Sequence, residues 1–210
     1  MPTPNQYTGK DLNSICSLLN RPIILTGVLR DMLTRHFLEA NTIEENDLKH
    51  LIWRGDDQTG ILIESIHRWR PEVTELRPAV IIKRNSCQNQ RVGIGDRDQG
   101  PPADGFGHPH YSTYWTGSHT LFCIGGTGAQ AELLGTEVQR ELTQFGPLLS
   151  QALGLHRFQV MQIGPVAEIE EAQESFTVPV TVGYTYEERW TIKQEAPLLS
   201  NISLSKILEC

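Results

Sequence analysis

A strict alternation of side chains at residues 176–186 constrains the fold more than any other feature of the sequence. Aromatic and β-branched residues occupy every second position: Phe176, Val178, Val180, Val182, Tyr184 and Tyr186. Because successive side chains of a β-strand point to opposite faces, this pattern predicts a strand with one face on a core. The residues between them are small or polar, and Pro179 among them has no N–H to donate. We therefore expect the strand to lie at a sheet edge or to have one side unpaired at Pro179.

A shorter strand, a glycine cluster and an amphipathic helix precede this strand and form the predicted core unit with it. Residues 119–124 are typical of a strand, and Gly125, Gly126 and Gly128 end it. Apolar residues then recur at helical spacing over residues 129–145. One face of that helix carries Ala131, Leu134, Val138 and Leu142.

Apolar periodicity and turn residues divide the rest of the chain into further elements. Strands are predicted at residues 60–64, 78–83, 110–116 and 157–163, and residues 88–94 extend the sheet as a hairpin arm. Helices are predicted at residues 22–41, 42–53 and 147–155. The first of them has a core-facing apolar side made of Ile24, Leu25, Val28, Leu29, Met32, Leu33 and Phe37.

Three local signals place boundaries between these elements. Thr42 and Glu45 have the spacing of a capping box at the start of a short helix. The Gly117-Ser118 pair predicts a hairpin turn between the strands on either side of it. The Gly146-Pro147 pair is expected to end the helix that begins at residue 129.

The chain has 210 residues, which is enough for one well-buried core, and we expect a single α/β domain over residues 1–210. Three segments lie outside the periodic pattern: a polar arm at 1–11, an exposed loop at 95–109 and a tail at 196–210. Long loops in compact domains are usually functional or become ordered on assembly. The tail is apolar enough to dock on another surface, and its apolar residues are Pro197, Leu198, Leu199, Ile202, Leu204, Ile207 and Leu208.

Charge and cysteine usage exclude several classes of protein. The net charge of −7 and the absence of a Lys or Arg cluster argue against a protein that grips nucleic acid by neutralising phosphates. No apolar run approaches the ~18–20 residues of a membrane span, and residues 1–10 lack the features of a signal peptide. We therefore expect a soluble protein made in the cytoplasm. The cysteines form no C-x-x-C pair, so we expect reduced thiols and neither a zinc site nor a disulfide framework; they are Cys16, Cys87, Cys123 and Cys210.

The sequence from Gly126 to Ala131 matches G-x-G-x-x-A, a variant of the fingerprint in which helix amides bind a dinucleotide pyrophosphate. That fingerprint also needs an acidic residue about 20 residues further on, at the end of the next strand, to hold the ribose. The next strand ends at Ile163 and Gly164, and the next acid, Glu168, comes too late. A structural turn is therefore favoured over a nucleotide site, and we expect no cofactor.

Metal and catalytic sites are not predicted either. The loop at 95–109 and its border carry ligand types that suit a metal ion, but their spacing matches no known cage; the residues are Asp96, Asp98, Asp104, His108 and His110. Ser118 and His119 are adjacent on a predicted strand and point to opposite faces, and the sequence contains no triad pattern.

Tryptophans and arginines are the candidate contacts with other subunits. Trp53, Trp69, Trp115 and Trp190 lie in or after polar stretches, which suits the rim of a core and an interface anchor equally. Cations between residues 68 and 91 have the charge to pair with acids of residues 168–174 on another subunit, although solvated positions are the simpler explanation. The candidate interface residues are Trp69, Arg70, Arg77, Arg84, Trp115 and Trp190.

Several short segments follow one another in a familiar order between residues 21 and 199. After an N-terminal helix come a Trp69-Arg70-Pro71 turn, the segment RPAVIIKRN at 77–85, GSHTLF at 117–122, a helix rich in Ala and Glu from Ala131, and a Val-rich strand that ends in YTYEERW at 184–190. In this order and in the character of its segments, the chain resembles the tail terminator proteins of tailed bacteriophages.

The resemblance implies a fold, an assembly and partners. The subunit would be α/β (α+β), with helices packed on a mixed, mostly antiparallel sheet and a long inserted loop. Six subunits would form a ring on the last ring of the tail tube, halt its polymerisation and offer the other face to the head connector. Such a protein would be a structural part of the virion neck, with no enzymatic activity and no cofactor.

The net charge agrees with that role, because an acidic lumen would let DNA pass without specific binding. A contact between the loop at 95–109 and a contractile tail sheath or a neck protein stays an open alternative. Two alternatives also stay open: a connector or stopper ring of the same neck, and a nucleotide-binding α/β enzyme that uses Gly126 and Gly128.

Overall fold

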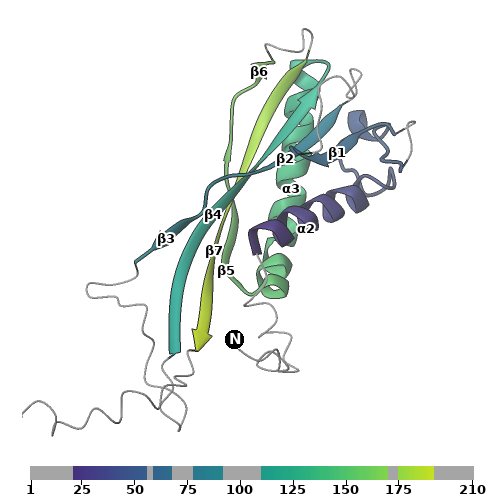
Figure 1. The fold of residues 1–210 in the computed structure, drawn as a ribbon. Coiled ribbons are helices and arrows are strands. Elements are labelled where there is room, and N and C mark those ends of the chain that lie inside the picture. The colour runs from purple at the N-terminus through teal and green to yellow at the C-terminus, as the bar shows by residue number, and fades with distance from the viewer. Residues whose placement is uncertain (1–20, 56–58, 68–77, 92–109, 170–174, 192–210) are drawn as a thin grey trace, which may run out of the picture.

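Two paired strands of sixteen residues each, β4 (His110–Gly125) and β7 (Phe176–Thr191), run through the whole length of the molecule (Figure 1). They are antiparallel, and their register is continuous from His110 opposite Thr191 to Gly125 opposite Phe176. The computed structural model describes residues 21–55, 59–67, 78–91, 110–169 and 175–191. The predicted arm, loop and tail at 1–11, 95–109 and 196–210 lie outside these residues.

Five shorter strands complete a seven-stranded sheet around this pair. The strand order is β1-β2-β4-β7-β5, while β3 pairs with β4 and β6 pairs with β7. The β1–β2 pair is parallel and the other pairs are antiparallel. The shorter strands are β1 (Leu62–Ser65), β2 (Ala79–Arg84), β3 (Gln88–Gln90), β5 (Leu155–Ile163) and β6 (Ala167–Glu168). The structure thus confirms a mixed, mostly antiparallel sheet.

Two α-helices pack on one face of this sheet, α2 (Arg21–His36) and α3 (Gly128–Leu153). Figure 1 shows α3 lying along the long strands, with α2 beside it. A single apolar cluster fills the layer between helices and sheet. Its largest contributions come from Leu25, Leu29 and Leu33 of α2, Leu134, Val138 and Leu142 of α3, and Val178, Val180, Val182 and Tyr184 of β7. The helical faces and the alternating strand that the sequence predicts are therefore confirmed.

Pro179 lies inside the sheet, between β4 and the β5–β6 side. Its carbonyl accepts a hydrogen bond from the Gly164 N–H at 2.7 Å, at the point where β5 ends and before β6 begins. The carbonyl and the nitrogen of one residue face the same side in an antiparallel strand, so the missing N–H faces this interruption. Of the two predicted placements for Pro179, the one with a locally unpaired side is confirmed.

The predicted turn at Gly117 and Ser118 is wrong, because β4 passes through both residues without a break. Gly117 is buried under the ring of Tyr184. A Cβ atom on Gly117 would lie 2.5 Å from Tyr184 Cζ and Oη, so the glycine is needed for the close approach of this ring and not for a reversal of the chain.

The predicted end of the helix at Gly146 and Pro147 is also wrong. α3 continues to Leu153, with Pro147 on its exposed side. Gly146 is buried against Phe158 of β5, where an added Cβ would lie 3.4 Å from the ring. The helix ends instead at Gly154, whose φ of 58° is the left-handed conformation typical of a helix C-cap.

The predicted capping box at Thr42 is wrong as well. The Thr42 hydroxyl donates to the carbonyls of Glu39, at 2.6 Å, and His36, so it closes the end of α2. The predicted helix at 42–53 is a three-residue 3-10 turn, η2 (Asn46–Leu48), and its N-cap Glu45 makes no side-chain cap bond.

We predict that Gly117→Ala destabilises the protein by about 1–3 kcal/mol, because the new methyl group overlaps the buried Tyr184 ring. Gly126→Ala is the matched control, since its Cβ would meet only Gln130 Oε1 at 3.8 Å, and its effect should stay within about 0.5 kcal/mol. Urea unfolding measures both. Equal stabilities for the two variants would contradict this explanation of Gly117.

Candidate assembly surface

The glycine turn before α3 is closed by hydrogen bonds from its own side chains. Thr127 is the N-cap of α3, and its hydroxyl accepts from the Gln130 N–H at 3.2 Å. Gln130 Oε1 accepts in return from the Gly126 N–H at 3.0 Å. This reciprocal capping engages two amides that a phosphate-binding turn would direct at its ligand.

The strands around this turn are also not arranged as in a dinucleotide-binding unit. There, the strand before the helix and the strand after it belong to a parallel sheet, with no antiparallel strand between them. Here, β7 lies between β4 and β5 and is antiparallel to both. Both observations favour the structural turn that the sequence analysis preferred.

A buried charge cluster joins the two helices. His36 at the end of α2 is hydrogen-bonded to two glutamates of α3, through Nε2 to Glu137 at 2.8 Å and through Nδ1 to Glu141 at 3.0 Å. Arg140 bridges Glu137 at 3.2 Å and Glu44 at 2.9 Å, and thereby extends the cluster to the surface. Burial by itself lowers the pKa of His36, but the bonds to Glu141 and Glu137 outweigh it and raise the pKa above 6.5.

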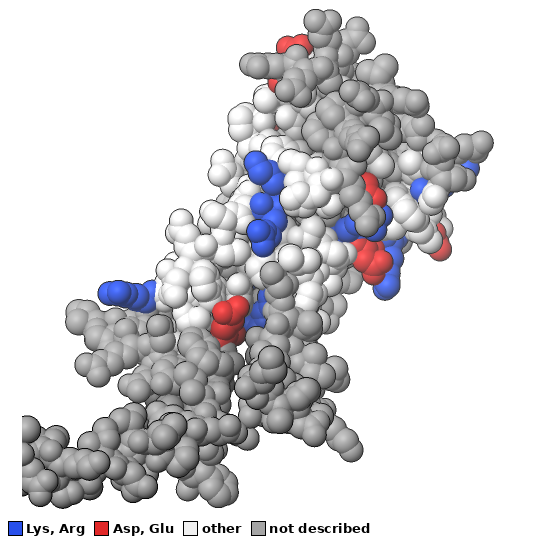
Figure 2. All heavy atoms as spheres, viewed as in Figure 1, with Lys and Arg blue, Asp and Glu red and all other residues white. Residues whose placement is uncertain are grey.

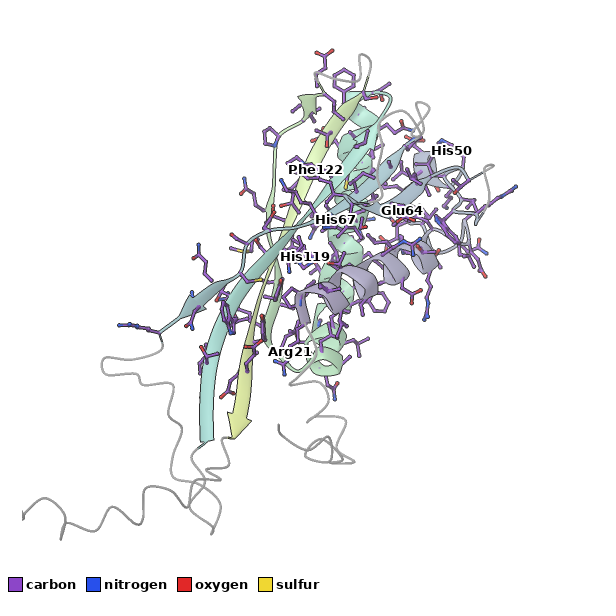
Figure 3. The ribbon with its side chains drawn as sticks, in the orientation of Figure 1. Arg21, His50, Glu64, His67, His119 and Phe122 are labelled. Carbon is purple, nitrogen blue, oxygen red and sulfur yellow. The ribbon has the colours of Figure 1, made fainter. Side chains whose placement is uncertain are left out.

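A second buried histidine, His119 of β4, lies between the sheet and α2 (Figure 3). The Thr26 hydroxyl donates to the Pro22 carbonyl at 3.0 Å, so it accepts from His119 Nε2 at 2.8 Å. This assigns the neutral tautomer with the proton on Nε2. Burial and the charge of Arg84 lower the pKa of His119 to about 4. His119 is fully buried and packs against the Tyr184 ring, so it is a core residue.

A groove lined by both apolar and polar side chains follows the outer side of β5, which is the last strand of the sheet order. The α3–β5 groove, as we call it, has a volume of about 850 Å³ and is bounded by α3 from Gln139 to Ser150 and by β5 from His156 to Ile163. Leu142, Gly146 and Phe158 are the buried part of its lining. Met161 and Ile163 on its β5 side are 62% and 45% exposed. Among the described residues, no strand pairs with this side of β5.

A second groove, of about 560 Å³, lies between α2 and α3 on the other side of α3. Phe145 and Leu148 of α3 line it and are 39% and 59% exposed. The His36 cluster forms part of its wall. Large apolar side chains are therefore exposed on both sides of α3, which is typical of a surface that other protein covers.

The structure places two of the candidate interface residues fully. Arg84 is exposed at the end of β2, opposite His119 of β4. Trp115, further along β4, is half-buried against the core, and its Nε1 donates to Glu188 Oε2 at 3.0 Å. Trp53, the fourth tryptophan considered, also packs on the rim of the core.

The side chains of the other four candidate interface residues lie outside the described part of the structure. Trp69, Arg70 and Arg77 lie outside the described residues, as does most of the acidic segment at 168–174. The backbone of Trp190 pairs with Tyr111 in the β4–β7 ladder, but its side chain is outside the described part. The role of all six residues at an interface stays a prediction.

The open face of the sheet is mainly uncharged. In Figure 2, Lys and Arg side chains occupy a few separate places on the visible face and leave most of the described surface without charge. Several outward positions of β4 and β7 carry hydroxyl groups, and Thr120 and Thr181 lie opposite each other with 3.4 Å between their Oγ1 atoms. A surface of this kind offers no basic patch for gripping nucleic acid.

Sequence reasoning missed the α3–β5 groove. The run at 157–163 predicts a strand, but nothing in it shows that the strand ends the sheet. The available signal was the change of parity within the run: Phe158 and Val160 alternate on one face, while Met161 and Ile163 place apolar residues on the other face, which a strand buried on one face would not need.

The described residues hold no group of three or more His, Cys, Asp or Glu that could bind a metal ion. None of the helices in these residues combines the length and the apolar character needed to cross a membrane. Comparisons with models of protein families and with curated proteins give no match for this chain.

The two buried histidines predict a stability maximum near pH 6.5. His119 in the folded chain binds its proton only near pH 4, so acidification from about 6.5 favours the unfolded chain. His36 behaves in the opposite way: its stabilising contribution is complete below pH 6.5 and is lost as the pH rises through its raised pKa. Each proton that only one of the two states binds changes the free energy of unfolding by up to about 1.4 kcal/mol per pH unit.

Urea unfolding between pH 4.5 and 8.5 separates the two contributions. His119→Phe should flatten the acid side of the profile, and His36→Gln the alkaline side. His50→Gln, at an exposed position, should leave the profile unchanged. An acid side that is unaltered in His119→Phe would contradict the assignment of a neutral, buried His119.

Proposed function

We propose that this protein is a tail terminator of a tailed bacteriophage, a ring-forming structural protein that caps the tail tube and joins the tail to the head connector. The observation that carries the proposal is the order of segments in the sequence, together with an α+β subunit whose helices cover one face of a mixed sheet. The virion neck is the location that follows, after assembly in the host cytoplasm.

The distribution of surfaces on the subunit supports a ring. A closed ring of identical subunits uses heterologous contacts, in which two different surfaces of the subunit meet. The two ends of the sheet order differ: β1 lies at one end, beside α2, and β5 lies at the other, beside the α3–β5 groove. The exposed apolar side chains at β5 and along α3 give one of these surfaces the character of a protein interface.

The charge of the chain supports the passage of DNA. The net charge is −7, and the basic side chains on the face shown in Figure 2 do not gather into one patch. A ring built from such subunits repels phosphate more than it holds it. The partners proposed are other copies of the chain, the tail tube protein, the head connector proteins and, in a contractile tail, the sheath.

Two alternatives compete with this proposal. A connector or stopper ring of the same neck would have the same type of subunit and differ in its partner. A nucleotide-binding enzyme would use the turn at Gly126 and Gly128, whose amides at Gly126 and Gln130 are engaged by Gln130 and Thr127.

The elongation of tail tubes tests the proposal. Tubes grown from the tube protein of the same phage are capped by adding the full chain, and more tube protein is then supplied. We expect tube length, measured by electron microscopy, to stop increasing once ends are occupied. Elongation at an unchanged rate, with the chain bound to connector rings instead, would favour the stopper alternative.

Calorimetric titration with adenine and guanine nucleotides tests the alternative from the other class. We expect no binding to the full chain. A micromolar dissociation constant that is lost in Gly128→Val would contradict the scaffold role of this turn.

A further inference from the structure

The α3–β5 groove combines the two features that attract an extended peptide. Strand β5 has nine residues, and no strand among the described residues pairs with its outer side. Such an edge presents unpaired N–H and C=O groups to any strand that comes close. The groove next to it is lined by Leu142, Phe158 and Val160, which offer apolar contacts to alternate side chains of an added strand.

The chain itself contains a segment that fits this groove. Residues 196–208 carry leucine and isoleucine side chains among small polar residues, and Ile202-Ser203-Leu204 alternates with the period of a strand. Glu209 follows the segment, and the exposed Arg157 lies near the start of β5. An added strand that is antiparallel to β5 therefore brings these opposite charges together.

The direction of β7 favours a neighbouring copy as the acceptor of this segment. Strand β7 pairs with β5 only from Val180 to Tyr186 and then continues to Thr191. These last residues carry the chain about 17 Å past the start of β5, at about 3.4 Å per residue. A return to the groove of the same subunit would have to retrace this distance, whereas the groove of a neighbouring copy does not impose that constraint.

We propose that residues 196–208 of one copy add as a strand to the free edge of β5 in a neighbouring copy and place their leucine and isoleucine side chains in its α3–β5 groove. This inference rests on the proposed ring and adds the element that closes it. The swapped segment connects each subunit to the next, so the ring gains backbone hydrogen bonds as well as apolar contacts.

Two substitutions of the same charge test the contact in the full chain. Leu204→Asp places a carboxylate against the apolar side chains of the groove, while Ser203→Asp places it on the opposite side of the added strand. We expect Leu204→Asp to weaken assembly by about tenfold or more and to increase hydrogen exchange at residues 157–163. Ser203→Asp should leave both unchanged. Equal effects of the two variants would overturn the proposal.

A photo-crosslinking amino acid in place of Leu204 identifies the copy that is contacted. Light and heavy isotope-labelled chains are assembled together, irradiated and digested. We expect mixed-isotope cross-links to the peptide that contains Val160 and Met161. Cross-links confined to one isotope would overturn the exchange between copies, because they would place the segment in its own groove.

Removal of residues 196–210 separates this inference from the proposed function. A truncated chain that still forms rings and stops tube growth would overturn the role of the segment and leave the terminator proposal intact. If the full-length chain forms no ring at the concentrations used for cross-linking, both the strand exchange and the terminator proposal would be overturned.

Discussion

The pairing of β4 with β7 is the interaction on which the rest of the structure depends. Its sixteen residue pairs fix which side chains of β7 meet the helices, since a shift of one residue would exchange Val178, Val180 and Val182 for the small or polar residues that alternate with them, such as Thr177 and Thr181. Strands β2 and β3 attach to β4, and β5 and β6 attach to β7, so the outer strands take their positions from this ladder. The position of β5 at the edge of the described strands, where we propose the contact between subunits, follows from the same order.

The two helices are held on the ladder by polar groups as well as by apolar packing. His36 and its two glutamates tie α2 to α3, and removing one member would leave a buried charge without its partner. Arg21 at the start of α2 donates to the carbonyls of Gly154 and Glu187 and thus joins both helices to β7. These bonds fix the position of the helical layer that bounds the α3–β5 groove, and a preorganised surface lowers the cost of docking a strand.

Periodicity predicts the parts of this fold that local sequence determines. The alternation at 176–186 and the helical faces of α2 and α3 were predicted with their buried residues, because burial on one face imposes a period. The errors at Gly117 and Pro147 have one cause: glycine and proline were interpreted as turn signals, while Gly117 makes room for Tyr184 and Gly146 makes room for Phe158. Such contacts join residues far apart in sequence. The groove was missed for the same reason, since the position of β5 at the end of the sheet depends on pairing and not on its own residues.

We propose that this subunit works only as part of a ring on a tail tube. The mass of the purified full chain, measured in solution alone and then with tail tubes, tests it most directly. We expect a species of about 142 kDa, six times the 23.6 kDa chain, formed in solution or on the tube end. A chain that stays at 23.6 kDa and leaves tube ends unoccupied at every concentration would contradict it.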